Sequence, residues 1–402
     1  MNNKLRSDFP IFSNQGEKLP IYFDSACQSL RPQVVIDSMI DYYQNYPACA
    51  GRSMHSFASK VTQKCDESRV TIAKFINARQ KEEVVFTRNT TEGINLVANC
   101  LDFKPGDIVI TSDKEHNSNL IPWQVLVNKK GIIHKIILSL SDNTFDLDEF
   151  KKTINSRVKL VSLGFTSNLD GVTIPAKEII ETAHKNGSLV LLDAAQTAPH
   201  QKIDVRELDV DFLAFSGHKM LGPSGTGVLY GKYKLLENLE PFMVGGDTVS
   251  SSTYTTHEFL APPEKFEAGL QDYAGIIGLG EAAKYLMKVG FSEIEKKERE
   301  INSYLTKELL AIPNLKIIGP ENSDKRGGII SFCVDGVDHH QLALILDQSA
   351  NIMVRSGQHC VHSWFHHHKI KGSVRVSVYF YNTLEEAELF VREIKKVIQV
   401  LL

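Results

Sequence analysis

The sequence predicts an α/β fold, with a mainly parallel seven-stranded sheet in a large domain and a smaller α+β domain after it. Two observations support this prediction. Short apolar segments alternate with helical patterns over much of the chain, which is typical of a parallel sheet covered by helices on both faces. After Ala274 this alternation stops, and a long, highly charged helical stretch leads into further strands. We therefore expect the large domain at 21–275, and the small domain at 1–20 and 276–402.

The large domain is expected to begin with a short strand at Ile21–Asp24. A helix then runs from Pro32, since proline suits the first helical position, to about Tyr46, and a second helix ends near Asn77. The helix expected at Pro175–Lys185 ends at Asn-Gly, a pair typical of a helix C-terminus. The seven strands of the sheet are expected at Val84–Thr87, Asp107–Thr111, His134–Leu138, Leu160–Phe165, Leu189–Leu192, Phe212–Phe215 and Val228–Gly231.

The small domain is expected to open with the charged helical stretch, from Ile276 to about Ile312. Its last helix should begin at Thr383, because Glu386 three residues later completes a capping box, and should run to Leu402. The strands between these helices are expected near Leu315–Ile318, Gly328–Val334, Ile352–Val354 and Val374–Tyr379.

Composition excludes several classes of protein. The 402 residues are 42% hydrophobic and 23% charged, as in ordinary globular proteins, and a net charge of −3 gives no electrostatic reason to bind nucleic acid or an anionic membrane. The N-terminal segment lacks the apolar core of a signal peptide, and no apolar run is long enough to span a bilayer. The six cysteines form no CxxC pair, which favours free thiols in a reducing cytosol. We therefore expect a cytoplasmic protein.

The most informative stretch is DFLAFSGHKMLGPSGTG, Asp211 to Gly227, and within it Lys219. The apolar segment Phe212–Phe215 reads as a buried strand, and ligands of α/β proteins bind at the carboxyl ends of such strands. A lysine placed there is a candidate Schiff-base amine for a carbonyl cofactor, with a surface lysine in a turn as the alternative. A nucleotide-binding loop is excluded, because Val228 follows the last glycine where that motif needs lysine.

Other residues that carry chemistry also follow expected strands. Asp193 ends the apolar segment SLVLLD, where it needs a cationic or hydrogen-bonding partner. TTEG at 90–93 opens a helix whose amides and hydroxyls suit a phosphate. Three further residues after strands are His116, Asn168 and Gln196. Each has an ordinary structural explanation, such as a helix cap, a solvated histidine, a turn asparagine or a satisfied buried carboxylate. On one sheet, however, they supply the parts for pyridoxal phosphate: an amine, an acid for the ring nitrogen, a phosphate cup and a ring for stacking.

The motifs TTEGIN, EHNSN, DAAQ, SGHK and FEAG occur in this order, and with them the chain resembles the class V aminotransferase group of fold-type I pyridoxal-phosphate enzymes. RSGQHC and RVSVYFYNT narrow the resemblance to the group II, SufS-like cysteine desulfurases over nearly the whole chain. These enzymes convert L-cysteine to L-alanine and serve iron–sulfur cluster assembly. By this resemblance the cofactor-binding residues are Lys219, Asp193, Gln196, His116, Thr91, Ser216 and His218, the substrate-binding residues are Arg375, Asn168 and Ala26, and the catalytic residues are Lys219, His116 and Cys360. The resemblance further implies a homodimer and a sulfur-acceptor protein as partners.

The chemistry of the residues agrees with these roles. Lys219 becomes a base at the substrate Cα, and we expect burial and the cofactor to lower its pKa. Cys360 suits a nucleophile that attacks sulfur and leaves a persulfide, because Arg355, His359 and His362 nearby favour a thiolate. The planar guanidinium of Arg375 suits a bidentate grip on the substrate carboxylate. The alternatives are a buried structural cysteine at position 360 and a surface charge on a strand edge at position 375.

The chain also departs from the family pattern. Leu270 follows FEAG where a threonine usually reaches the partner subunit's cofactor phosphate, so that contact is lost. The other departures lie on the substrate side and are Cys27, Gly51, Asn117, Gln358 and the sequence VHSW after Cys360. Cys27 is expected to be a packing residue, with a second redox thiol as the alternative. The histidines 366–368 are expected in a solvated helix or loop, and no metal site is expected.

Two other functions stay open on this basis. Another class V enzyme, such as a transaminase, an epimerase or a selenocysteine lyase, would keep Lys219 and make little use of Cys360. A non-catalytic relative of the fold would need neither residue. The presence of Lys219, Asp193, His116 and Arg375 together argues against it.

Overall fold

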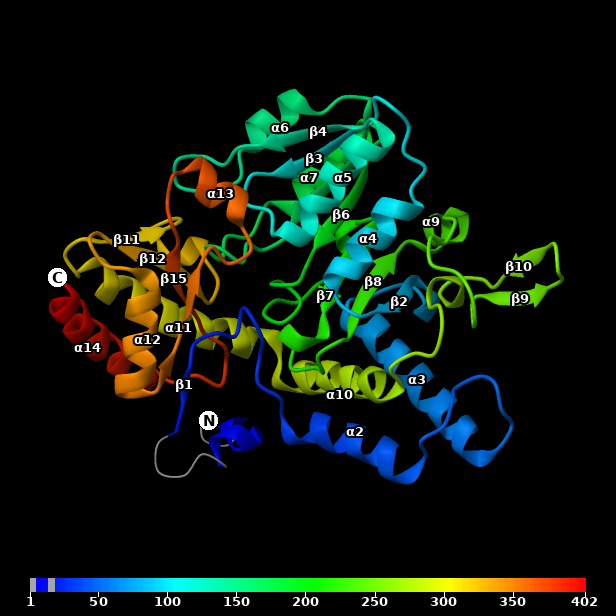
Figure 1. The fold of residues 1–402 in the computed structure, drawn as a ribbon, viewed down its shortest axis with the longest axis horizontal. Helices are drawn as coiled ribbons and strands as arrows, with labels where there is room; N and C mark the ends of the chain where they lie inside the picture. The colour runs from blue at the N-terminus through cyan, green and yellow to red at the C-terminus, as the bar shows by residue number, and fades with distance from the viewer. Residues whose placement is uncertain (1–4, 14–18) are drawn as a thin grey trace.

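The computed structural model describes residues 5–13 and 19–402, so part of the expected small-domain segment 1–20 lies outside the described residues. A seven-stranded sheet crosses the centre of the molecule in the order β2-β8-β7-β6-β5-β3-β4 (Figure 1). Its strands are β2 Val84–Thr87, β3 Ile108–Ser112, β4 Ile133–Ile137, β5 Val158–Gly164, β6 Leu189–Asp193, β7 Phe212–Ser216 and β8 Gly227–Gly231. The mainly parallel seven-stranded sheet is therefore confirmed.

β8 is the exception to the parallel arrangement, since it runs antiparallel to both of its neighbours, β2 and β7. Gly227, at its start, passes close to the backbone of Asn89. A Cβ atom at this glycine would lie 2.6 Å from the Cα of Asn89, so only glycine fits. This contact brings β8 against the residue that caps α4, Thr90–Cys100, and fixes the start of that helix next to the strand ends.

Helices cover both faces of this sheet because its strands are apolar on both faces. Alternate strand residues such as Val109 and Leu191 pack against α4 and α5, Ile121–Lys130. Their neighbours, such as Ile110 and Leu192, pack in a second core with α7, Ala176–Lys185, and α10, Tyr273–Val289. The sheet is thus buried from both sides, as expected of parallel strands.

A second, antiparallel sheet has the order β11-β12-β15-β14. Its strands are β11 Leu315–Ile318, β12 Ile329–Val334, β14 Arg355–Gly357 and β15 Ser373–Ser377. An apolar core joins this sheet to α11 Phe291–Leu310, α12 His339–Ala350 and α14 Leu384–Leu401. The predicted capping box is confirmed: the Thr383 hydroxyl accepts from the Glu386 amide, and the Glu386 carboxylate accepts from the Thr383 amide.

The N-terminal segment connects the two sheets. β1, Ile21–Tyr22, pairs in parallel with β13, Ile352–Met353, and Asp24 forms an isolated bridge to Ser377. The chain then runs through α2, Gln33–Asn45, and α3, Ser56–Phe75, both of which pack on α10. These contacts cross the expected boundary at 275/276, and the division into domains stays a proposal.

The expected helical stretch from Ile276 to about Ile312 is two helices. Gly290, with φ of +87°, separates α10 from α11. The remaining elements of the described residues are short: α6 Leu147–Thr153, α8 Val205–Leu208, α9 Tyr233–Asn238, α13 His362–His367, β9 Val249–Ser252, β10 His257–Phe259 and six 3₁₀ turns. The β9–β10 hairpin projects from the end of the molecule farthest from the second sheet (Figure 1). Of the helices in the described part of the chain, none combines the length and apolar character needed to cross a membrane.

Candidate active site

A cavity of about 300 Å³ lies at the carboxyl ends of the central strands. Every residue that the sequence predicted for the site lines it, namely Ala26, Thr91, His116, Asn168, Asp193, Gln196, Ser216, His218, Lys219, Cys360 and Arg375. The structure thus brings together residues spread over more than 300 positions of the sequence. A second cavity of about 600 Å³ shares Thr166 and Gln196 with the first and contains none of the other predicted residues.

Lys219 stands in the short 3₁₀ turn Gly217–Lys219 that follows β7 directly. The Met220 and Gly222 amides close the turn by donating to the Gly217 carbonyl at 3.0 and 2.9 Å, and the Gly217 amide donates to the Thr226 carbonyl at 2.8 Å. A Cβ atom at Gly217 would meet the Thr226 side chain at 2.2 Å, so this position needs glycine. Burial lowers the pKa of Lys219, while the Asp193 carboxylate opposes this shift. The expected direction of the shift is confirmed.

Asp193 ends β6, beside β7. Its Oδ1 accepts from the Ala195 amide at 2.9 Å, and burial raises the pKa of the carboxyl, with Lys219 opposing the shift. Gln196 is buried nearby, and its Nε2 donates to the Ala26 carbonyl at 2.7 Å. The Gln196 Oε1 atom is buried and has no hydrogen-bond partner among the described residues. The cavity therefore presents a carboxylate and an amide acceptor that is left without a donor.

The N-terminus of α4 forms one wall of the cavity. The Thr90 amide donates to the Ser216 hydroxyl at 2.9 Å, and the Thr91 hydroxyl lies 2.7 Å from that of Ser118. His218 completes this wall, and burial followed by the charge of Lys219 lowers its pKa to about 4. At neutral pH these groups are uncharged hydrogen-bonding groups beside the positive end of a helix, which suits a phosphate.

His116 stands in the loop that follows β3 and lines the same cavity. Its Nδ1 accepts from the Ser118 amide at 3.1 Å, so the neutral ring carries its proton on Nε2. Burial, with the charges of Lys219 and Arg375, lowers the pKa of His116 to about 3. The ring is therefore neutral at physiological pH, as stacking on an aromatic cofactor requires.

Arg375 lies on β15 of the second sheet and is 2% exposed. Its guanidinium donates from Nη1 to the Asn168 carbonyl at 3.0 Å and from Nη2 to Asp24 Oδ1 at 3.2 Å. Arg375 Nε is buried without a hydrogen-bond partner among the described residues. The Asn168 side chain donates instead to the His359 carbonyl at 2.7 Å, and the Ala26 amide donates to the Ser377 hydroxyl at 3.0 Å. Of the residues predicted to bind substrate, Arg375 therefore keeps one unpaired N–H donor, its Nε. The side chain of Asn168 is used to hold the loop at His359.

Cys360 stands in the loop between β14 and α13. It has φ of +61° and follows His359 with φ of +50°, so two successive residues occupy the left-handed region. The loop is held because the Asn117 amide donates to the Cys360 carbonyl at 2.8 Å, and Asn117 Nδ2 lies 2.8 Å from His362 Nδ1. The thiol of Cys360 is half-buried and lines the cavity.

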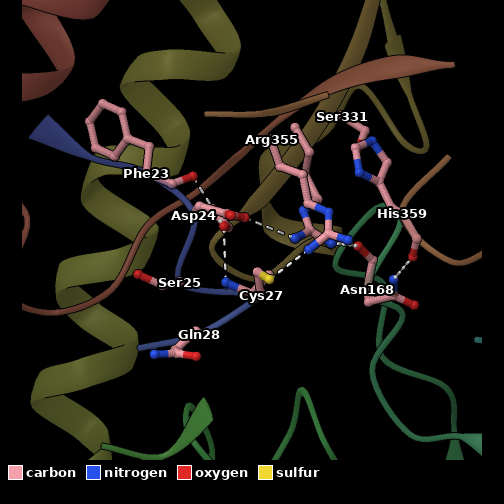
Figure 2. A network of polar contacts seen from close by, with 12 residues as sticks. Phe23, Asp24, Ser25, Cys27, Gln28, Asn168, Ser331, Arg355 and His359 are labelled. Atoms are coloured by element: carbon pink, nitrogen blue, oxygen red, sulfur yellow. Dashed lines mark hydrogen bonds and ion pairs between the residues drawn. The ribbon is translucent and has the colours of Figure 1, made fainter. Parts of the chain in front are cut away.

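The residues that were expected to favour a thiolate at Cys360 are not all arranged to do so. Burial, with Arg375 and Arg355, lowers the pKa of His359 to about 2, so this ring is neutral. The Arg355 guanidinium donates from Nη1 to the Cys27 sulfur at 2.6 Å (Figure 2). The prediction that Arg355, His359 and His362 favour a thiolate at Cys360 is therefore wrong for His359. The side-chain hydrogen bond of Arg355 goes to another cysteine, and His362 Nδ1 lies 2.8 Å from Asn117 Nδ2.

Several cavity residues were missed by the sequence analysis. Three of them belong to motifs that the sequence analysis used: Thr90 lies in TTEGIN, and Glu115 and Ser118 lie in EHNSN. Their position next to predicted site residues in the sequence could have identified them. Burial raises the pKa of Glu115 to about 7. Lys114 forms a buried ion pair with Asp170 at 2.7 Å, and no sequence pattern indicated this pair.

Comparisons with known proteins agree with this geometry. A model of the aminotransferase class-V family matches residues 21–390. A probable cysteine desulfurase of Synechocystis is 40% identical over 98% of this chain and 95% of its own length, and one of Pyrococcus abyssi is 40% identical over 98% and 97%. The apo structure of a cysteine desulfurase from Thermococcus onnurineus has a TM-score of 0.94 and 38% identity, and covers 99% of this chain and 98% of that one.

The match spans both sheets and every residue of the cavity described above. The group II subtype is not distinguished by it. The chain belongs to the aminotransferase class-V family.

Proposed function

We propose that this protein is a pyridoxal-phosphate-dependent cysteine desulfurase, which converts L-cysteine to L-alanine and keeps the sulfur as a persulfide on Cys360. One observation carries the proposal: an amine of lowered pKa, Lys219, and a thiol, Cys360, line the same cavity. Relatives and a structural neighbour that match nearly the whole chain are named cysteine desulfurases, which supports it.

The residues of the cavity fit pyridoxal phosphate. The unpartnered Gln196 Oε1 can accept a hydrogen bond from the ring hydroxyl of the cofactor. The buried Asp193 carboxylate can pair with a cationic ring nitrogen. Thr91, Ser216 and His218 lie at the N-terminal end of α4, where a phosphate is favoured. Lys219 is the amine for the aldehyde carbon, and the neutral His116 ring is the stacking partner. When bound, the cofactor supplies an electron sink for the bonds at the substrate Cα.

Lys219 acts as the base. A lowered pKa increases the fraction of neutral amine near pH 7, so Nζ accepts the proton from the substrate Cα more readily than a solvated lysine does. The rate of this step therefore rises with pH and levels off above the pKa of Lys219, below the 10.5 of an ordinary lysine.

Arg375 holds the substrate carboxylate. Its buried guanidinium has an unpartnered Nε beside the donors that bind Asp24 and Asn168, and a carboxylate on this side would receive charge-assisted hydrogen bonds. The Cys360 thiolate then attacks the substrate sulfur. The carbon–sulfur bond of cysteine breaks, a sulfur–sulfur bond forms on Cys360, and protons complete L-alanine, so no external oxidant or reductant is used.

The alternatives within the family make less use of the site. A transaminase or an epimerase has no step for a thiol, yet Cys360 faces the same cavity as Lys219. A selenocysteine lyase would use Lys219 on a selenium substrate and make little use of Cys360. A non-catalytic protein would have no use for a lysine of lowered pKa beside a buried aspartate.

The subtype, the cellular location, the oligomeric state and the sulfur acceptor are part of the same proposal. We expect a group II, SufS-like enzyme that works as a cytoplasmic homodimer, passes its sulfur to an acceptor protein and serves iron–sulfur cluster assembly. The exposed Leu270 and the projecting β9–β10 hairpin are surfaces available to a second copy.

The proposal is tested with purified protein, pyridoxal phosphate, L-cysteine and a reductant. Alanine and sulfide are measured together for the wild type, for Cys360→Ala and for Cys49→Ala, a control at an exposed cysteine outside the cavity. Equal amounts of alanine and sulfide from the wild type and the control, with none from Cys360→Ala, are expected. Full turnover by Cys360→Ala would overturn the persulfide mechanism, and alanine formation from L-selenocysteine alone would establish the lyase instead.

A further inference from the structure

A second thiol lies in the same cavity as Cys360. Cys27 follows the Asp24 bridge that joins β1 to the second sheet, and both cysteines line the cavity of about 300 Å³. Both thiols are half-buried. The other four cysteines, Cys49, Cys65, Cys100 and Cys333, do not line this cavity.

Within the described residues, the one hydrogen bond of the Arg355 side chain goes to Cys27. Its Nη1 lies 2.6 Å from the Cys27 sulfur, and Figure 2 shows the guanidinium directed at that atom. Among the described residues Arg355 forms no ion pair, because the nearby Asp24 carboxylate bonds to Arg375 at 3.2 Å. Within that part of the chain, the Asp24 carboxylate thus pairs with Arg375 alone, and the Arg355 guanidinium has the Cys27 sulfur as its side-chain partner. A guanidinium N–H directed at the sulfur can give a charge-assisted hydrogen bond to an anionic sulfur group there.

We propose that Cys27 is a second sulfur-carrying residue, which accepts the outer sulfur of the Cys360 persulfide. The inference rests on the proposed function, which supplies that persulfide. The Cys27 thiolate attacks the outer sulfur, a sulfur–sulfur bond forms on Cys27, and the bond to Cys360 breaks. Cys360 leaves as a thiolate and takes up the proton that Cys27 released. The number of sulfane sulfur atoms does not change, so the transfer uses no oxidant or reductant.

The geometry supports such a transfer in two ways. A persulfide extends the reach of Cys360 by about 2 Å, the length of a sulfur–sulfur bond, into a cavity that Cys27 also lines. After the transfer, the negative charge of a Cys27 persulfide lies beside Arg355, whereas no cation among the described residues donates a hydrogen bond to the Cys360 sulfur. The sulfur is therefore better stabilised on Cys27.

The consequence is a larger sulfur capacity. Once Cys360 has given up its sulfur, it can react with a second substrate, so without an acceptor or a reductant one chain stores two sulfur atoms. Without Cys27 it stores one. This capacity is measured independently of turnover.

The experiment uses the holoenzyme with excess L-cysteine and no reductant, quenched with an alkylating reagent. Peptide mass spectrometry then locates persulfide sulfur on each cysteine in the wild type, Cys27→Ser, Cys360→Ser and the control Cys49→Ser. Retained visible absorbance of the cofactor shows that each variant is folded. We expect sulfur on Cys360 and then on Cys27 in the wild type and the control, on Cys360 alone in Cys27→Ser, and on neither in Cys360→Ser.

The outcomes separate this inference from the function on which it rests. Sulfur on Cys360 of the wild type and never on Cys27 would overturn the inference and leave the desulfurase standing. Equal labelling of exposed Cys49 and Cys27 would overturn it as well, because the transfer would then be unspecific. Sulfur on Cys27 of Cys360→Ser would show direct loading and overturn the relay. No sulfur on Cys360 in the wild type would overturn the proposed function itself.

Discussion

The two sides of the cavity are built in different ways. On the cofactor side, Asp193, Ser216 and Lys219 stand at the ends of neighbouring strands of the seven-stranded sheet, and α4 begins beside them. On the sulfur side, Cys27 and Cys360 come from loops near the second sheet. The hydrogen bond between Arg355 and Cys27 joins residues 328 positions apart.

This difference explains what each side does. Strand ends inside a sheet buried on both faces hold their side chains rigidly, as base chemistry at one carbon atom requires. The sulfur side contains the successive left-handed residues His359 and Cys360, an unusual backbone that its neighbours must hold in place. A persulfide must form in the cavity and then leave it, so this side has to deliver sulfur as well as bind substrate. The following changes test the separation of the two sides, from the largest expected effect to the smallest.

Lys219→Ala should remove all covalent attachment of the cofactor and all turnover, because the cavity contains no other amine at the end of β7. Lys114, also in the cavity wall, is held in its buried ion pair with Asp170. The measurement is borohydride reduction with pyridoxal phosphate, followed by peptide mass spectrometry. Lys202→Ala, at an exposed lysine, is the control and should keep the label. A label on another lysine of the cavity in Lys219→Ala would contradict the assignment.

Arg375→Lys should raise the KM for L-cysteine by roughly 10–100-fold, since a lysine keeps the charge and loses the planar fork that a carboxylate needs. Steady-state kinetics measure the effect, and the cofactor absorbance should not change because Arg375 lies on the sulfur side. The control is Arg392→Lys, at an exposed arginine. An unchanged KM would remove Arg375 from the substrate site.

Gly227→Ala should weaken the cofactor side alone. The added Cβ would lie 2.6 Å from the Asn89 Cα and push the start of α4 away from the cavity. We expect a loss of ~1–3 kcal/mol in the free energy of unfolding, the usual cost of overpacking, and weaker retention of pyridoxal phosphate. Denaturant unfolding and cofactor titration measure both. In the control Gly246→Ala the nearest neighbour is a side-chain atom at 3.7 Å, and no change is expected.

Leu270→Thr should have the smallest effect, a few-fold tighter retention of the cofactor, as expected for one added hydrogen bond. Leu270 is 66% exposed, so the change costs little in the folded chain. The prediction depends on a dimer in which this residue reaches the partner subunit's phosphate site. Dialysis against buffer, with exposed Leu344→Thr as the control, measures retention. Equal retention by the wild type and Leu270→Thr would count against that dimer.

The sequence predicted the cofactor side well because local patterns determine it. Asp193 and the sequence SGHK each follow an apolar strand. Because the two strands are parallel neighbours, their carboxyl ends lie side by side, and this brings the residues together. The antiparallel direction of β8 follows from its short connection to β7, although the strand pattern alone did not show it. The break at Gly290 was missed because helical periodicity continues on both sides of it.

The contacts of the sulfur side could not be predicted in the same way. Arg355, His359 and Cys360 are close in the sequence, and proximity suggested that the first two act on the third. The fold instead turns Arg355 toward Cys27, which comes from a distant part of the chain, and buries His359, whose Nε2 lies 2.8 Å from the Ser373 hydroxyl. Asp24 and Arg375 are 351 positions apart, and only tertiary packing joins them.

The most direct test of the account is whether the base on the cofactor side works without the thiol on the sulfur side. Cys360→Ala holoenzyme is incubated with L-alanine in deuterated water, and exchange of the Cα proton is followed by NMR. The account predicts exchange at the wild-type rate, rising with pH and levelling off below 10.5, because Lys219 has a lowered pKa, and no exchange in Lys219→Ala. Loss of exchange in Cys360→Ala, with the cofactor still bound, would contradict the separation of the two sides.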